Sequence, residues 1–251
     1  MLIYTNHKVS MHQIEGCIGV FDVAHPIDFE DKETEERITQ RSINGTIGIL
    51  QAYLDSKTVK HVVYTCSAST VVGTGSSNVI IDECSWIDVD VMRTLKPFAS
   101  CYAISKTLTE KASLGFAEKN GIDLVTVIPT WIHGTFCYSS NSWLCSFIDE
   151  NDSCYVLKYH NFSFSQRIYI IYMFYLIVIK NFCAGHQNFS MSYPPIVPFV
   201  HVDDVTNAHI FLFENPNAKG RYTCSAVEIT GEKLTEFLLT RYSEFQKQIT
   251  E

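Results

Sequence analysis

Short apolar runs alternate with helical segments through the first half of the chain, and this alternation limits the fold more than any other feature. Residues 17–24, 61–64 and 124–128 are apolar runs of strand length. Residues 35–54 carry apolar side chains at helical spacing, and residues 100–119 form a long helical segment that ends at an Asn-Gly pair. This order of strands and helices predicts an α/β fold with a parallel sheet and right-handed crossovers.

Regular patterns return near the end of the chain. Residues 199–202 and 221–225 have the composition of strands, and residues 205–213 that of a helix. Asp203 stands just before this helix and is expected to cap its N-terminus. A final amphipathic helix is expected over residues 230–241.

The stretch between these two regular parts has no clean period. Most residues from 155 to 182 are Phe, Tyr, Met, Ile, Asn or Lys. Because these types have A/T-rich codons, one hypothesis is that the segment is translated intron. The other is an unusual insertion with an apolar core. Its apolar run at residues 168–179 is shorter than the ~20 residues that span a bilayer.

Charge and cysteine content exclude several classes of protein. A net charge of −8 and a pI near 5.6 argue against binding to nucleic acid or to an anionic membrane surface, since both need basic residues. The nine cysteines are an odd number and contain no Cys-x-x-Cys pair, so no metal site is expected. Without an apolar leader near Met1, we expect reduced thiols and a cytoplasmic protein.

Tyr102 and Lys106 form the main candidate for a catalytic pair. Four residues apart on a helix, their side chains share one face. A lysine ammonium beside a phenol is expected to lower the phenol pKa, so that the phenol can exchange a proton. That chemistry suits a reductase, in which hydride adds to a carbonyl carbon and the phenol protonates the oxygen. The same spacing also occurs in Tyr4 with Lys8 and in Tyr53 with Lys57.

Position in the predicted sheet favours Tyr102 over the other two tyrosines. Tyr102 begins the helix that follows the strand at 61–64, and ligands of open parallel sheets bind beyond the carboxyl ends of strands. Ser67 follows the same strand and could polarise a substrate carbonyl by a hydrogen bond. The alternative interpretation is a surface tyrosine and a serine that caps a loop.

Long stretches of the sequence resemble the dihydroflavonol reductases, plant members of the extended short-chain dehydrogenases/reductases, and most closely their vestitone reductase branch. The resemblance spans roughly residues 16–136 and 198–242, and several blocks in the right order are more specific than one motif. The blocks are GCIGVFDVAHPIDFE (16–30), KTVKHVVYTCSAS (57–69), DECSWIDVD (82–90), KPFASCYAISKTLTEKA (96–112), NGIDLVTVIPT (120–130) and PFVHVDDVTNAHIFLFENPNAKGRY (198–222).

The resemblance implies a catalytic triad of Ser67, Tyr102 and Lys106 and the cofactor NADPH/NADP. Tyr102 would donate the proton, Lys106 would hold the nicotinamide ribose and tune the tyrosine, and Ser67 would orient the carbonyl. The residues implied beside the cofactor are Val23, Ala24, His25, Tyr102, Lys106, Pro129, Thr130, Trp131 and Ile132.

Several of these positions depart from the family pattern. His25 replaces a threonine, Trp131 replaces a smaller aliphatic residue, and Cys66 replaces a serine beside the catalytic one. Val72 replaces the asparagine that contacts substrate in the family. The implied substrate is therefore a flavonoid-like or other aromatic carbonyl compound, with its identity open. The oligomeric state is open as well.

The glycine-rich turn that binds pyrophosphate in this family has no counterpart in the sequence. Gly16-x-x-Gly19 leads into a strand, and Gly73-x-Gly75 lies in a polar loop with no helix after it. We therefore expect an incomplete Rossmann-type sheet that lacks its first βαβ units, with truncation at both ends.

The expected organisation has three regions. Residues 1–136 would be the remnant of the nucleotide-binding domain, residues 137–197 a divergent or inserted segment, and residues 198–251 part of the substrate region. Two functions stay open: an NADPH-dependent reductase, or an inactive truncated paralogue or interaction remnant. An epimerase or dehydratase would fit the triad but not the vestitone-like blocks.

Overall fold

The structure, a computed structural model, covers the two regular parts of the chain. It describes residues 14, 16–26, 33–72, 81–97, 99–134 and 196–230 and the single residues 233, 236 and 240. The segment at 155–182 and most of the helix expected at 230–241 lie outside the described residues, as does all but the end of the region at 137–197.

The described elements alternate as the sequence predicts. In chain order they are β1 (Gly19–Asp22), α2 (Glu35–Ser56), β2 (His61–Thr65), a short 3-10 helix η2 (Ala68–Thr70), α3 (Val89–Leu95), α4 (Ser100–Asn120), β3 (Leu124–Pro129), β4 (Trp131–His133), β5 (Ile196–His201), α6 (Val202–Glu214), β6 (Gly220–Cys224) and β7 (Val227–Thr230).

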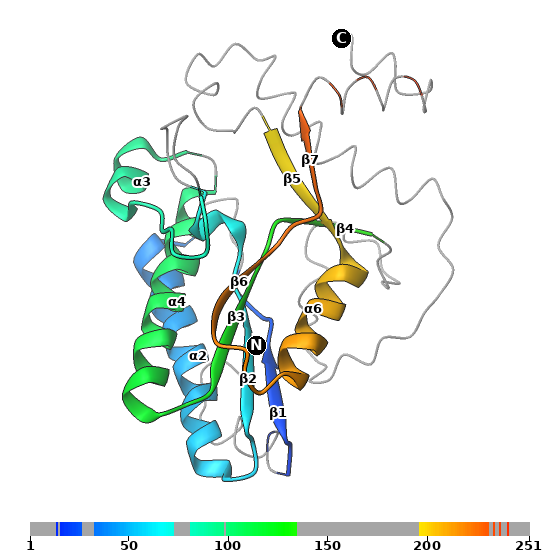
Figure 1. The fold of residues 1–251 in the computed structure, drawn as a ribbon. Coiled ribbons are helices and arrows are strands. Elements are labelled where there is room, and N and C mark those ends of the chain that lie inside the picture. The colour runs from blue at the N-terminus through cyan, green and yellow to red at the C-terminus, as the bar shows by residue number, and fades with distance from the viewer. Residues whose placement is uncertain are drawn as a thin grey trace, which may run out of the picture.

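Four strands form a parallel sheet in the order β1-β2-β3-β6. Helices α2 and α4 pack side by side on one face of this sheet, and α6 lies on the other (Figure 1). This three-layer α/β arrangement confirms the predicted fold class. Strands β4, β5 and β7 form a second, smaller sheet.

The core has one part on each face of the parallel sheet, because alternate residues of a strand point to opposite faces. Buried residues on the α2/α4 face include Leu50, Val62, Tyr64, Ala117, Leu124 and Ile128. Those on the α6 face are Val63, Val125, Val127, Leu212 and Ala218. The strands therefore read as near-continuous apolar runs, as expected for a sheet covered on both sides.

The helix ends show where sequence signals worked and where they failed. Gly121 ends α4 in the left-handed conformation (φ 67°), as the Asn-Gly pair predicts. The N-cap of α6 is His201 rather than Asp203, because the His201 Nδ1 accepts a hydrogen bond from the Asp203 amide at 3.2 Å. Asp203 lies instead in the first turn, where its charge complements the helix dipole.

The five cysteines within the described residues (Cys17, Cys66, Cys84, Cys101 and Cys224) form no disulfide bond there. None of the helices in the described ranges is both long enough and apolar enough to cross a bilayer.

Candidate active site

Ser67 and Tyr102 meet at the carboxyl end of the parallel sheet. Ser67 follows β2 and caps η2, accepting a hydrogen bond from the Ser69 amide at 3.2 Å. The Ser69 hydroxyl donates to the Ser67 hydroxyl at 3.0 Å. Tyr102 lies in the first turn of α4, and its phenol hydrogen-bonds the Ser67 side chain. The structure thus brings together two members of the expected triad, Ser67 and Tyr102.

The acidity of the Tyr102 phenol differs from the prediction. Burial raises the pKa of Tyr102 to about 12, the hydrogen bond from Ser67 lowers it, and the nearby Cys66 thiol raises it further. The expected lowering by a lysine is therefore wrong for this structure, and the phenol is protonated at neutral pH. A protonated phenol is the form that a proton donor needs.

Lys106 lies one helical turn after Tyr102, and its ammonium group binds the backbone at the end of β2. Its Nζ donates a hydrogen bond to the Thr65 carbonyl at 2.8 Å and lies 5.3 Å from the centre of the Tyr64 ring. Burial lowers the pKa of Lys106, and the acidic groups around it, Cys66, Asp22 and Glu110, oppose this shift. The lysine thus anchors at the end of β2, where its remaining N–H donors can meet a ligand.

His25 lies against the candidate pair. Its ring meets the Tyr102 ring edge-on, with centroids 5.5 Å apart, and its Nε2 lies 3.2 Å from the Ser105 hydroxyl. Ser105 Oγ in turn lies 3.3 Å from the hydroxyl of Ser42 on α2. Burial, and then the charges of Lys106 and Arg41, lower the pKa of His25 well below its usual value, so the imidazole is neutral.

The other positions implied beside the cofactor lie at or just beyond the carboxyl ends of strands β1 and β3. Val23 and Ala24 follow β1 and are exposed. Pro129 ends β3, and the Thr130 amide donates to the Cys224 carbonyl at 3.0 Å, which ties β3 to β6. Trp131 and Ile132 on β4 are 37% and 41% exposed and offer an apolar surface.

The sequence analysis missed a buried ion pair next to Ser67. Glu110 of α4 is fully buried and binds Arg221 of β6, with Nε and Oε1 2.9 Å apart. Glu110 stands four residues after Lys106, so helical spacing placed it on the inner face. Its partner, far along the chain, had no comparable signal.

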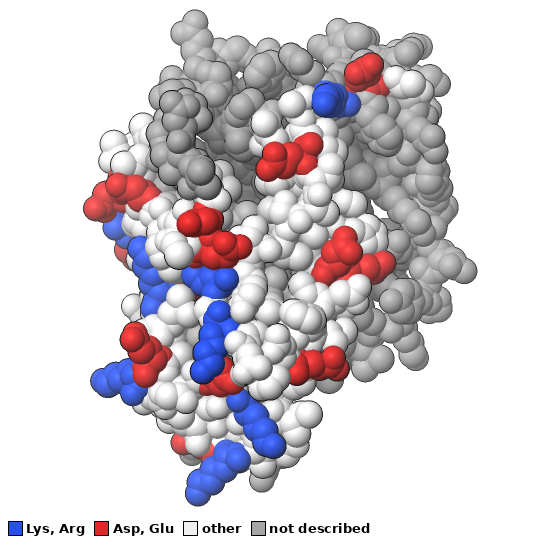
Figure 2. Space-filling model, viewed as in Figure 1, with Lys and Arg blue, Asp and Glu red and all other residues white. Residues whose placement is uncertain are grey.

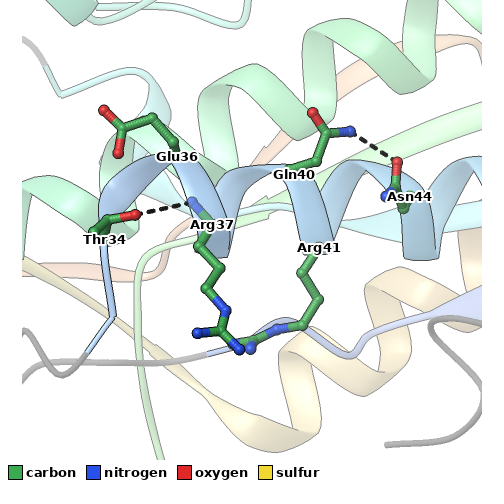
Figure 3. A pocket seen from close by; sticks show the side chains of 6 residues that line it. All are labelled: Thr34, Glu36, Arg37, Gln40, Arg41 and Asn44. Carbon is green, nitrogen blue, oxygen red and sulfur yellow. Dashed lines mark hydrogen bonds between the residues drawn. The ribbon is translucent and has the colours of Figure 1, made fainter.

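A separate depression on α2 does not belong to this constellation. It has a volume of about 600 Å³ and is lined by Thr34, Glu36, Arg37, Gln40, Arg41 and Asn44 (Figure 3). Its two guanidinium groups both pair with Glu33. Basic and acidic side chains are interspersed over the described part of the face that Figure 2 shows. No cluster of three or more metal-ligating side chains occurs among the residues described.

Comparison with known proteins decides the family. Residues 5–179 match the 3-beta hydroxysteroid dehydrogenase/isomerase family. The chain belongs to this family. Vestitone reductase of Medicago sativa is 40% identical over 233 residues, which cover 93% of this chain and 61% of that protein. Dihydroflavonol 4-reductase of Zea mays is 37% identical and covers 92% of this chain and 56% of its own length.

Solved structures of the family agree with the fold. The crystal structure of vestitone reductase from alfalfa superposes with a TM-score of 0.66 at 35% identity, covering 97% of this chain and 65% of that one. Gre2 from Candida albicans in complex with NADPH gives a TM-score of 0.67 at 21% identity and supports the fold alone. The predicted membership in the extended short-chain dehydrogenases/reductases of the dihydroflavonol reductase type is confirmed. The chain spans about three-fifths of the length of these relatives.

Proposed function

We propose that this chain is an NADPH-dependent reductase of a carbonyl group on a flavonoid-like or other aromatic substrate. The observation that carries the proposal is the contact between Ser67 and a protonated Tyr102 at the carboxyl end of the sheet, with Lys106 one turn further along α4. The alfalfa and maize relatives, named as reductases of vestitone and dihydroflavonol, support the reaction class.

The residues present fit the nicotinamide end of such a cofactor. The Lys106 ammonium uses one donor on the Thr65 carbonyl among the described residues, which leaves further donors for ribose hydroxyls. Trp131 and Ile132 present apolar surface for a planar ring. When bound, NADPH supplies a hydride to the carbonyl carbon.

The protein's own groups act on the carbonyl oxygen. The Ser67 hydroxyl orients that oxygen by a hydrogen bond, and the Tyr102 Oη donates its proton to it. In this proposal Lys106 holds the ribose. His25 stays neutral and supports the Tyr102 ring from its edge. We place the reaction in the cytoplasm, which agrees with the free thiols of the described residues.

Turnover of a vestitone-type ketone or a dihydroflavonol with NADPH tests the proposal. Tyr102→Phe should lower kcat by about 100-fold or more, the range of general acid catalysis, while circular dichroism shows an unchanged fold. The matched control is Tyr53→Phe, because Tyr53 also stands four residues before a lysine. The Tyr53 hydroxyl donates a hydrogen bond to the Lys60 carbonyl. Full activity of Tyr102→Phe would remove this residue from the mechanism.

Cofactor binding separates the enzyme from an inactive paralogue. Saturable enhancement of nicotinamide fluorescence, lost in Lys106→Ala, is expected if the chain is a reductase. A folded chain that neither enhances this fluorescence nor turns over either substrate contradicts the proposal. It would favour a catalytically inactive paralogue.

A further inference from the structure

The buried ion pair of Glu110 and Arg221 has no part in the chemistry proposed above. Two hydrogen bonds join the groups, from Arg221 Nε to Oε1 at 2.9 Å and from Nη2 to Oε2 at 3.2 Å. The Glu110 side chain is fully buried and that of Arg221 is 8% exposed. A buried ion pair is weak evidence for stability, because desolvation offsets much of the attraction.

Arg221 has every donor of its guanidinium group engaged. Arginine carries five N–H donors in a rigid planar fork, and this one makes five hydrogen bonds. The acceptors are both carboxylate oxygens of Glu110, the carbonyls of Glu83 and Ser85 at 2.6 and 2.8 Å, and the Thr70 hydroxyl at 3.3 Å. The Trp86 ring stacks on the guanidinium at 3.7 Å. Lysine cannot reproduce this fork.

Residues before and after Ser67 in the chain form hydrogen bonds with the Glu110–Arg221 pair. The residue before it, Cys66, donates its thiol proton to Glu110 Oε2 at 2.9 Å. On the other side, the Thr70 hydroxyl donates to the Ser67 carbonyl at 2.9 Å and accepts from Arg221. The turn that presents the Ser67 hydroxyl to Tyr102 is thus held at two points by one ion pair.

We propose that Arg221 and Glu110 are positioning residues that fix the Ser67 turn so that the Ser67 hydroxyl meets the Tyr102 phenol. The contacts come from β6, α4 and residues 83–86, so the site geometry depends on segments far apart in the sequence. The proposed function enters only in naming Ser67 and Tyr102 as the reacting groups. A purely structural ion pair would change stability and leave the Ser67–Tyr102 contact as it is.

The phenol carbon of Tyr102 reports this contact directly. We would label tyrosine at Cζ with ¹³C, identify the Tyr102 resonance by its loss in Tyr102→Phe, and use Ser67→Ala to mark the position without the hydrogen bond. Arg221→Lys should move the resonance most of the way toward the Ser67→Ala position. Arg93→Lys is the control, since Arg93 also binds a glutamate, Glu35, in a bidentate pair at 2.9 and 3.0 Å, but on the surface.

An unchanged Tyr102 resonance in folded Arg221→Lys overturns the proposal. If that variant does not fold, Thr70→Val decides, because it keeps the side-chain shape and removes only the hydroxyl between Arg221 and the Ser67 carbonyl. A wild-type resonance in Thr70→Val then overturns it, and a shifted one supports it. The measurement needs neither NADPH nor substrate, so missing turnover would contradict the proposed function and leave this inference intact.

Discussion

The protonation of His209 is fixed by its two neighbours. Its Nδ1 lies 2.7 Å from the Val205 carbonyl, which only accepts, so this nitrogen carries the proton. Its Nε2, 2.6 Å from the Thr65 hydroxyl, therefore accepts a hydrogen bond from it. Because the Thr65 carbonyl holds Lys106, α6 contributes to the placement of that lysine from the opposite face of the sheet.

Acid should therefore destabilise this protein through its buried histidines. Burial lowers the pKa of His209 in the folded chain, so the unfolded chain takes up the proton first. The stability gained by the neutral ring is present above the unfolded pKa of about 6.5 and is lost as the pH falls through the folded pKa. His25, whose pKa burial also lowers, acts in the same direction.

We predict that His209→Gln reduces the loss of unfolding free energy between about pH 7 and pH 5, where an unperturbed histidine titrates. At neutral pH the variant should be less stable by about 1–2 kcal/mol, the cost of altering a buried hydrogen bond. Urea unfolding across this pH range measures both effects. A steeper acid response in His209→Gln contradicts a lowered pKa of His209 in the folded chain.

At the scale of elements, the close approach of β1 to α6 depends on a glycine. A Cβ atom built on Gly19 would overlap the ring of Phe213 on α6. Phe21, two residues on and thus on the same face of β1, lies 5.2 Å from the Phe213 ring, centroid to centroid. The small residue at position 19 thus lets an aromatic side chain pack directly on the strand backbone.

Gly19→Ala should destabilise the fold by about 1–3 kcal/mol, because the added methyl group forces the Phe213 ring to move. Gly48→Ala is the matched control inside α2. No atom lies within 4 Å of its added Cβ, so the change should stabilise the helix by about 0.5–1 kcal/mol. Thermal unfolding of both variants is the measurement, and an equal effect of the two would show that Phe213 does not limit position 19.

At the scale of the whole molecule, the parallel sheet joins distant parts of the chain. Strand β6 pairs with β3 although some ninety residues of sequence separate their partners, as with Val127 and Tyr222. The Thr223 amide donates outward to the Glu83 carboxylate at 3.2 Å, so by strand alternation the Tyr222 amide faces β3. Val125 and Val127 of β3 are fully buried.

Proline at these two neighbouring positions should have unequal effects. Tyr222→Pro removes an amide that faces β3 and should cost about 3 kcal/mol or more. Thr223→Pro removes an amide that points away from the sheet and should cost clearly less, since proline is tolerated on the open side of an edge strand. Chemical denaturation compares the two variants. A larger loss in Thr223→Pro would contradict the register described here.

Much of the fold could be predicted because apolar periodicity depends on local sequence. Strands β1, β2, β3, β5 and β6 and helices α2 and α4 follow from it, and so does the Gly121 stop. The inner face of α4 is the exception, since Ser105, Thr107, Thr109, Glu110 and Ser113 are buried there with little apolar pattern to mark them. Helix α3 and the strands β4 and β7 are too short to give a period.

The sequence by itself determined the alternation of strands and helices, the Tyr102–Lys106 spacing and the family blocks, because each is a property of neighbouring residues. Only the tertiary structure decided that burial raises the Tyr102 pKa, that Lys106 binds the end of β2, and that Arg221 holds the Ser67 turn. These outcomes depend on desolvation and on contacts between distant segments, and neither can be read from residues that are adjacent in the chain.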